Sequence, residues 1–201
     1  MSYFSFSSIN AAFIKAGISA GLWGFIALIS FSCSFEKNTP PDENALLSGF
    51  FDVQSYFRNE ISRLNKEQPS ITKRIELEGQ LENIQKKGLD YERELQVFVN
   101  SDINRVSWKE KYKVDSIFQE AKLVKIRYEA IDTTLKTKLL EVEFEKTEVR
   151  SVKIHNATRS IVAQTNQILQ YHPTEGYSIE NEQKILFSKT RKLFLEVNFK
   201  T

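Results

Sequence analysis

The sequence predicts an α+β fold in which two amphipathic helices pack on an antiparallel meander sheet of about five or six strands, plus a short N-terminal hairpin. Three observations carry this prediction. Apolar residues recur at helical spacing in two early segments, and they alternate with polar residues in several later segments. Gly and Pro are sparse, at 7 and 4 of 201 residues, which is the composition of a folded domain rather than of a disordered segment.

The first helix is predicted over residues 42–66. Asp42 or Asn44 is expected to cap its start, and Pro69 is expected to close it. Its apolar residues are three or four positions apart and therefore share one helical face. They are Leu46, Phe50, Val53, Phe57, Ile61 and Leu64.

A hairpin and a second helix are predicted next. Between residues 71 and 81 the apolar positions are all odd, a period of two, and Gly79 lies near the expected turn. Asp90 is expected to cap the second helix. The apolar residues of this helix are Tyr91, Leu95, Phe98, Val99 and Ile103.

Strands are predicted from residue 124 to the C-terminus, because apolar and polar residues alternate there and turn-forming residues separate the runs. The predicted strands cover residues 124–130, 140–144, 152–154, 160–172, 176–180, 183–188 and 193–199. The predicted turns cover residues 132–134, 145–148, 156–159, 172–176 and 188–191.

The charges of the chain are nearly balanced, with 28 Lys and Arg residues against 26 Asp and Glu residues. A protein dedicated to nucleic-acid binding normally carries a strong basic excess, so the composition argues against that class. Cys33 is the only cysteine, so no disulfide can form within the chain.

The N-terminal segment has the order of an export signal. Lys15 is followed by an uncharged stretch over residues 16–35, about the length that crosses a bilayer as a helix, and charged residues resume at Glu36. Three outcomes stay open. They are a cleaved lipoprotein signal that leaves Cys33 as the lipidated N-terminus, an uncleaved signal anchor, and an ordinary signal peptide cut near Ser32.

The tetrapeptide that ends at Cys33, Ser-Phe-Ser-Cys, resembles a bacterial lipobox with Ser30 where an aliphatic residue is usual. Relaxed boxes of this kind occur in Bacteroidetes-type bacterial lipoproteins, which the chain resembles in this segment. The resemblance implies an outer-membrane lipoprotein that faces the periplasm, and an inner-membrane single-pass protein is the alternative. The implied divisions are a signal peptide, a lipidated Cys33 with a flexible tether, and a single α+β domain, over residues 1–32, 33–41 and 42–201.

Two further sets of residues are candidate sites. Ser116 and Thr133 lie in Asp-Ser-Ile and Asp-Thr-Thr, which resemble the acceptor of Bacteroidetes-type periplasmic O-glycosylation. The resemblance implies that these two hydroxyls can carry glycans. Tyr171, His172 and Tyr177 lie around a predicted turn and form a candidate binding loop.

No catalytic or metal-binding motif is present, so the sequence predicts no enzyme, no metal site and no cofactor. Glu141, Glu143 and Glu145 share one face of a predicted strand. We expect them to lie on a solvated face and to pair across strands with cations such as Lys125 and Arg127.

These observations favour a non-enzymatic, membrane-anchored envelope lipoprotein that acts as a binding or accessory module. Its expected partners are the membrane, through the N-terminal lipid or helix, and an envelope protein, but no nucleic acid. Two alternatives stay open: a periplasmic carrier of an apolar, lipid-like ligand between sheet and helices, and a single-pass signal-anchored protein. A binding module predicts a filled core and an exposed apolar patch, whereas a carrier predicts an internal cavity of at least about 300 Å³.

Intact-mass measurement of the membrane-fraction protein tests the role of Cys33. We expect the wild-type chain to begin at Cys33 and to carry the mass of acyl chains. The Cys33→Ser variant is expected to lose that mass, because it lacks the thiol that accepts the lipid. A chain that keeps residues 1–32 and carries no acyl mass would instead establish the signal anchor.

Overall fold

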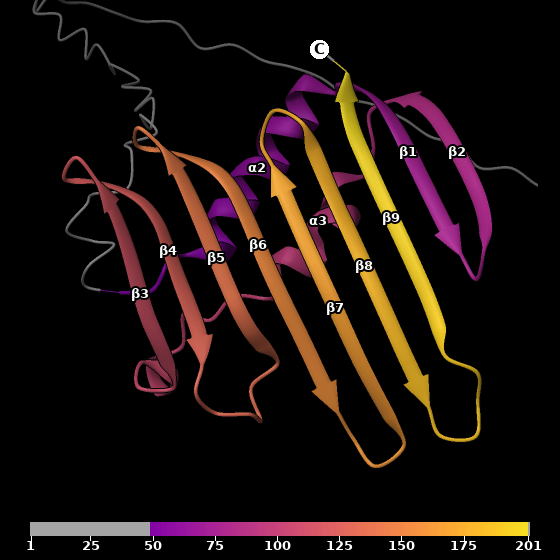
Figure 1. Ribbon diagram of the computed structural model, residues 1–201. Coiled ribbons are helices and arrows are strands. Elements are labelled where there is room, and N and C mark those ends of the chain that lie inside the picture. The colour runs from indigo at the N-terminus through magenta and orange to yellow at the C-terminus, as the bar shows by residue number, and fades with distance from the viewer. Residues whose placement is uncertain (1–48, 201) are drawn as a thin grey trace, which may run out of the picture. The chain divides into compact units, whose positions relative to one another are not determined.

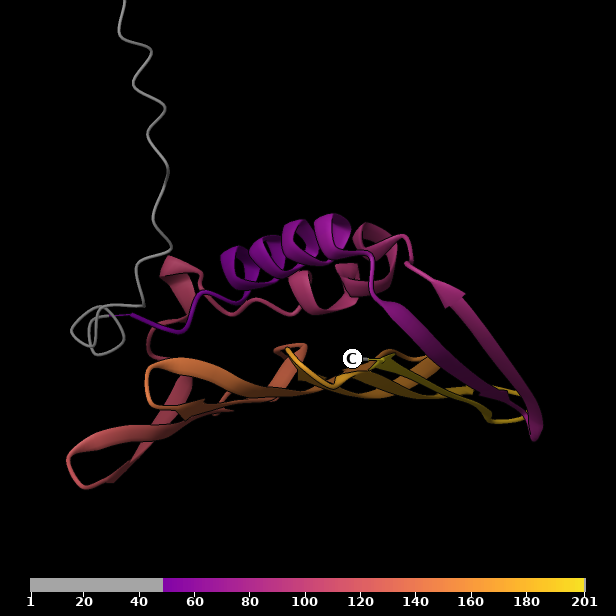
Figure 2. The same cartoon turned by 90° about the horizontal axis from the view of Figure 1, so that it is seen from above.

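The structure is a computed structural model that describes residues 49–200. These residues form one nine-stranded antiparallel sheet with two helices on one of its faces (Figures 1 and 2), and the strand order is β2-β1-β9-β8-β7-β6-β5-β4-β3. The helical elements are α2 (Val53–Glu67), α3 (Tyr91–Val99) and the short 3₁₀ turn η1 (Val106–Trp108). The strands are β1 (Ser70–Leu77), β2 (Gln80–Lys87), β3 (Tyr112–Gln119), β4 (Lys122–Ala130), β5 (Thr137–Glu145), β6 (Glu148–Arg159), β7 (Ala163–His172), β8 (Gly176–Ile185) and β9 (Arg191–Lys200).

The chain crosses the helical face once to join the two edges of the sheet. β2 forms one edge and β3 forms the other, and residues 88–111, which include α3, run between them (Figure 1). α2 lies beside α3 on the same face (Figure 2). Both helices therefore bury their apolar stripes against one side of the sheet and leave the other side to solvent.

The predicted fold class is wrong, because the sheet has nine strands rather than five or six and dominates the domain. The N-terminal hairpin does not stand apart, since β1 pairs along its whole length with β9. The alternation of apolar residues predicted the hairpin and its turn near Gly79 correctly. The hairpin pairs with β9, at the other end of the chain, and a local sequence pattern does not predict which distant strand lies beside it.

The predicted number of strands is also wrong because three segments of the sequence have misleading local patterns. The sequence does not predict β3, because an edge strand exposed on both faces needs no apolar alternation, and all of its residues except Tyr112 are exposed. The two strands predicted at residues 176–180 and 183–188 are one strand, β8. The turn predicted at residues 156–159 lies inside β6, where polar Asn156 is buried and hydrogen-bonded.

The helix predicted over residues 42–66 begins only at Val53, because residues 49–52 are described and are not helical. Asp52 caps it by accepting the backbone N–H of Ser55 at 2.8 Å, and Pro69 follows its end as predicted. The predicted caps Asp42 and Asn44 lie outside the described residues. The apolar stripe is buried as its spacing predicts, at Val53, Phe57, Ile61 and Leu64.

α3 forms where the sequence predicts a helix. Asp90 caps it by accepting the backbone N–H of Arg93 at 3.2 Å. Its buried residues are Tyr91, Leu95, Phe98 and Val99. The short helix therefore presents a continuous apolar face to the sheet, which compensates for the low stability of an isolated helix of this length.

The centre of the core is a layer of aromatic rings between the helices and the sheet. Phe57 of α2 packs on Phe98 of α3 with ring centroids 4.7 Å apart, and both rings contact Tyr171 of β7, at 5.1 and 6.0 Å. Tyr177 of β8 lies 6.3 Å from Phe98. All four side chains are buried, and each aromatic pair adds about 0.5–1.5 kcal/mol beyond the burial of its area.

The hydroxyl groups of two core tyrosines bond to the helices above them. Tyr171 donates to Glu60 of α2 at 2.5 Å, and Tyr177 donates to Glu94 of α3 at 2.9 Å. Each carboxylate also faces a cation, Arg63 at 2.7 Å from Glu60 and a lysine of β1 beside Glu94. Burial, followed by the adjacent carboxylates, raises the pKa of both phenols, so the hydroxyls stay protonated and continue to donate.

Two neighbouring tyrosines give a matched test of this bonding. Tyr171→Phe removes a donor from the partly buried Glu60, and we expect the free energy of unfolding to fall by about 1–3 kcal/mol. Tyr56→Phe is the control, because the buried hydroxyl of Tyr56 has no hydrogen-bond partner among the described residues. We expect that change to be neutral or stabilising in urea unfolding. Equal destabilisation by both substitutions would contradict the assignment.

Candidate functional site

The three residues of the predicted binding loop lie together at the turn between β7 and β8, where Tyr171 pairs with Tyr177, but they differ in burial. Tyr171 and Tyr177 are buried in the aromatic core, and their hydroxyls are taken up by Glu60 and Glu94. His172 is half-buried at the end of β7, where a tight turn leads to β8. The two tyrosines therefore serve packing, and only His172 is accessible to a ligand.

The two predicted glycan acceptors are exposed. Ser116 lies on β3, and Thr133 lies in the turn between β4 and β5. Their accessibility is compatible with modification, which stays a prediction. Cys33 lies outside the described residues.

The strip of carboxylates on β5 pairs with cations of β4. Lys125 lies 3.2 Å from Glu141 and 3.4 Å from Glu143, and Arg127 lies 3.9 Å from Glu141. This confirms the predicted cross-strand pairing for these two carboxylates. Glu145 follows a register shift near the end of β5 and makes no ion pair within residues 49–200. The strip is therefore a neutralised solvent face rather than an ion-binding site.

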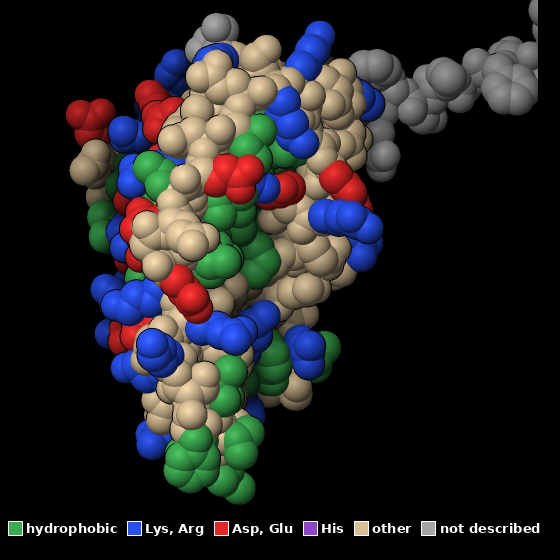
Figure 3. All heavy atoms as spheres, turned by 90° about the vertical axis from the view of Figure 1, so that its right-hand side faces the viewer, with side chains coloured by type: hydrophobic (Ala, Val, Ile, Leu, Met, Phe, Trp, Pro, Cys, Tyr) green, Lys and Arg blue, Asp and Glu red, His purple; other side chains and the backbone are tan. Residues whose placement is uncertain are grey.

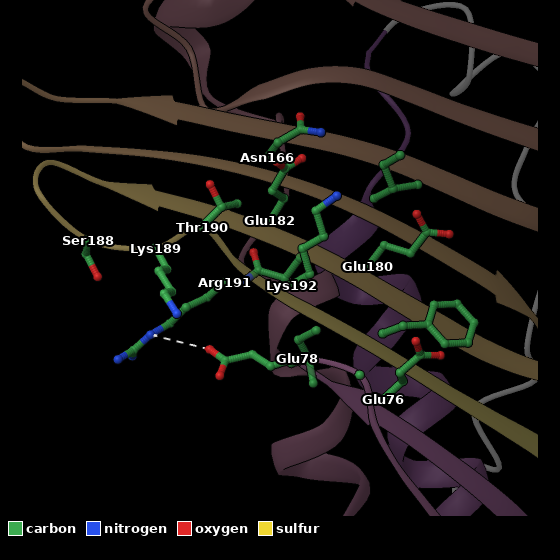
Figure 4. Close-up of a pocket in the computed structure, with 15 residues that line it drawn as sticks. Glu76, Glu78, Asn166, Glu180, Glu182, Ser188, Lys189, Thr190, Arg191 and Lys192 are labelled. Atoms are coloured by element: carbon green, nitrogen blue, oxygen red, sulfur yellow. Dashed lines mark ion pairs between the residues drawn. The ribbon is translucent and has the colours of Figure 1, made fainter.

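A hollow of about 920 Å³ lies on the solvent face of the sheet, beside the turn between β8 and β9 (Figure 4). Arg191 and Glu78 form an ion pair there at 3.9 Å. The charged side chains of both signs that line it are Glu76, Glu78, Glu180, Glu182, Lys189, Arg191 and Lys192. No group of three or more metal-ligating side chains in the described part of the chain is placed to hold an ion. The hollow thus offers charged groups of both signs to a polar molecule.

The space between the helices and the sheet is filled by side chains. Phe57, Phe98 and Tyr171 are fully buried and in mutual contact. These rings do not line the hollows beside the β8–β9 turn, between α2 and α3, or beside the β4–β5 turn. This packing favours the filled core expected of a binding module over the cavity expected of a carrier.

The two edges of the sheet differ in character. β2 exposes one large apolar side chain, Leu81, beside charged side chains such as Lys86 and Lys87, which discourage pairing with another strand. β3 exposes Val114, Ile117 and Phe118, at 47, 51 and 50% of their full accessibility. We call these three residues the β3 edge. Within residues 49–200, β3 pairs only with β4, so the backbone groups on its other side have no sheet partner there.

Sequence reasoning missed the β3 edge because its turn carries no standard signal. Glu120 and Ala121 connect β3 to β4 with φ of 48° and 62°. Two-residue hairpin turns of this conformation normally contain Gly or Asn, so neither residue marks the turn in the sequence. The short apolar run of Ile117 and Phe118 was the only signal available.

Comparison with protein families, with characterised proteins and with solved structures finds no match for this chain. Neither of the described helices combines the length and the hydropathy that a membrane span requires. Support for a function therefore comes from the surfaces described above.

The groove between α2 and α3 contains a carboxyl group whose pKa is raised, that of Asp102. Asp102 lines a hollow there, and one of its oxygens is buried with no hydrogen-bond partner among the described residues. Its other oxygen accepts the backbone N–H of Asn104 at 3.0 Å. Burial raises the pKa of Asp102, and the nearby Asp52 adds to the shift. No histidine or cysteine lines this hollow, so the perturbed acid has no adjacent imidazole or thiol to activate.

The raised pKa of Asp102 predicts a pH-dependent cost to stability. Because the folded-state pKa lies above the unfolded-state value of about 3.9, the unfolded state loses this proton first as the pH rises. Asp102 therefore stabilises the folded state less at pH values above its folded-state pKa than at pH values below its unfolded-state pKa. We expect Asp102→Asn to raise the unfolding temperature at pH 7 more than at pH 4, measured by thermal melts. A variant less stable than wild type at pH 7 would contradict this account.

Proposed function

We propose that the protein is a non-enzymatic, membrane-anchored envelope lipoprotein that binds an envelope protein through the β3 edge. The lipobox-like segment that ends at Cys33 supports the anchor. The single observation that carries the binding role is the exposure of three large apolar side chains on a strand with one side unpaired in the described residues. An exposed apolar edge strand is a template for pairing with another chain.

The binding mode that this edge favours is strand addition. An extended segment of the partner adds beside β3, main-chain hydrogen bonds supply affinity, and side chains on alternate faces supply specificity. Val114 and Phe118 lie on the face of the sheet that carries the helices, next to Tyr128 and Leu123 of β4. Ile117 lies on the opposite, solvent face. A partner strand would therefore find apolar contacts on both faces.

The two edges offer matched positions for a test. Ile117 and Leu81 are 51% and 55% exposed, and both lie on the solvent face of the sheet, one on each edge strand. A photo-crosslinking residue at Lys113 is expected to capture one partner protein in intact cells. We expect Ile117→Lys to lower that adduct by about tenfold, because the charge replaces an apolar contact on the edge. Leu81→Lys is expected to leave it unchanged.

Circular dichroism of both variants controls for folding, and both substitutions are at exposed positions. An adduct that survives Ile117→Lys, or one formed equally from Asn83 on the other edge, would contradict binding at β3. The absence of any adduct from Lys113 would count against the proposal in the same way. Mass spectrometry of the adduct identifies the partner.

A further inference from the structure

Two turns at the same end of the sheet expose a cluster of apolar side chains. The turn between β6 and β7 carries Ile161 and Val162, and the turn between β8 and β9 carries Leu186 and Phe187 (Figure 1). We call these four residues the apolar tip. The backbone N–H of Leu186 donates to the carbonyl of Val162 at 2.9 Å, so the two turns are held side by side.

Two side chains of the apolar tip are the most exposed of the large apolar side chains in the described residues. Phe187 is 100% exposed and Ile161 is 97% exposed, while Val162 and Leu186 are 59% and 55% exposed. Phe187 also has φ of +62°, a conformation that bulky side chains rarely adopt. The phenyl ring lies fully in solvent and therefore does not pack the core of this domain.

Cations surround the apolar tip. Residues 159–164 and 184–192 contain five basic residues and no acidic residue. We call these five the basic collar, namely Arg159, Lys184, Lys189, Arg191 and Lys192. Lys184 lies 3.6 Å from Glu182, and Arg191 lies 3.9 Å from Glu78. The other three make no ion pair with any residue of the described range. Figure 3 shows hydrophobic side chains gathered at this end of the molecule, with Lys and Arg side chains next to them.

We infer that the apolar tip inserts into the interfacial region of an anionic phospholipid bilayer. Apolar side chains flanked by Lys and Arg are the composition that binds membrane interfaces, because the apolar groups enter the acyl boundary while the cations meet the phosphates. Negative headgroups around the inserted tip would attract the cations of the basic collar, each worth about 1 kcal/mol near the surface. This contact is separate from the N-terminal anchor and from the β3 edge.

The charges favour a bilayer over a second copy of the chain. Two tips packed together would bring two basic collars into contact, and like charges repel. The tip also projects from two turns rather than lining a groove, which suits a fluid surface that can close around it. A second copy and a protein partner are therefore outcomes of the test rather than the proposal.

Tryptophan placed at the tip reports insertion in the full, anchored chain. We propose Phe187→Trp, with Thr174→Trp as the control, because Thr174 is exposed in the turn between β7 and β8 at the opposite end of the sheet. Each protein is reconstituted into vesicles of phosphatidylcholine with phosphatidylglycerol, some of it brominated to quench nearby tryptophan. The native Trp108, together with Trp23 in a chain that keeps residues 1–32, gives a background that the parent chain measures. We expect blue-shifted, quenched emission from position 187 and unchanged emission from position 174.

Removal of charges from the basic collar tests the electrostatic contribution to membrane binding. Each cation near an anionic surface is worth about fivefold in partition. We therefore expect the double variant Lys189→Gln, Arg191→Gln to lower the ratio of inserted to withdrawn tip by about 25-fold. The measurement is the decrease in bromine quenching of the tryptophan at position 187. Vesicles of phosphatidylcholine alone are expected to give a larger decrease, because all five cations of the basic collar then lose the anionic surface.

Several results would overturn the inference. Equal quenching at positions 187 and 174, or none at either, would exclude selective insertion of the tip. Equal insertion into both kinds of vesicle would exclude recognition of anionic lipid. A blue shift at position 187 that depends on protein concentration in detergent without lipid would assign the tip to a second copy. None of these results bears on the adduct formed at β3, so this inference and the proposed function fail separately.

Discussion

The contact of Phe57 and Phe98 with Tyr171 is the interaction on which the rest of the domain depends. It joins the two helices to each other and to the middle of the sheet in one place. α3 has only nine residues, too few for a stable isolated helix, so its packing on these rings is what holds it in the crossover between the two edge strands. Removal of this layer would expose the apolar face of the sheet.

The same layer explains why function lies at the periphery. The core uses the hydroxyls of Tyr171 and Tyr177 to satisfy Glu60 and Glu94, so these polar groups are not available to a ligand. The helices cover the middle of one sheet face, and the other face is polar and laced with ion pairs. Seven of the eleven large apolar side chains that are exposed in the described residues lie on the β3 edge and on the apolar tip.

The sequence predicted those features whose cause is local. Both helical stripes, the cap at Asp90 and the turn near Gly79 follow from spacing and from side chains a few residues apart. The prediction from sequence was wrong where the burial of a residue differs from what its neighbours along the chain suggest. The exposed strand β3 lacks alternation, and Asn156 looks like a turn residue but is buried in β6, where it donates to Ser101 at 2.8 Å. Tyr171 and Tyr177 likewise had the composition of a binding loop but form part of the core.

The sequence by itself determined the balanced charge, the presence of an export-like segment before a folded domain, and the faces of its helices, because these depend on composition and on neighbours along the chain. Only the tertiary structure decided that β1 pairs with β9, which strands became edges, and which apolar residues were left outside the core. Those outcomes depend on contacts between the two ends of the chain. A periodic pattern shows that a strand has an apolar face, but it does not show what covers that face or which strand lies beside it.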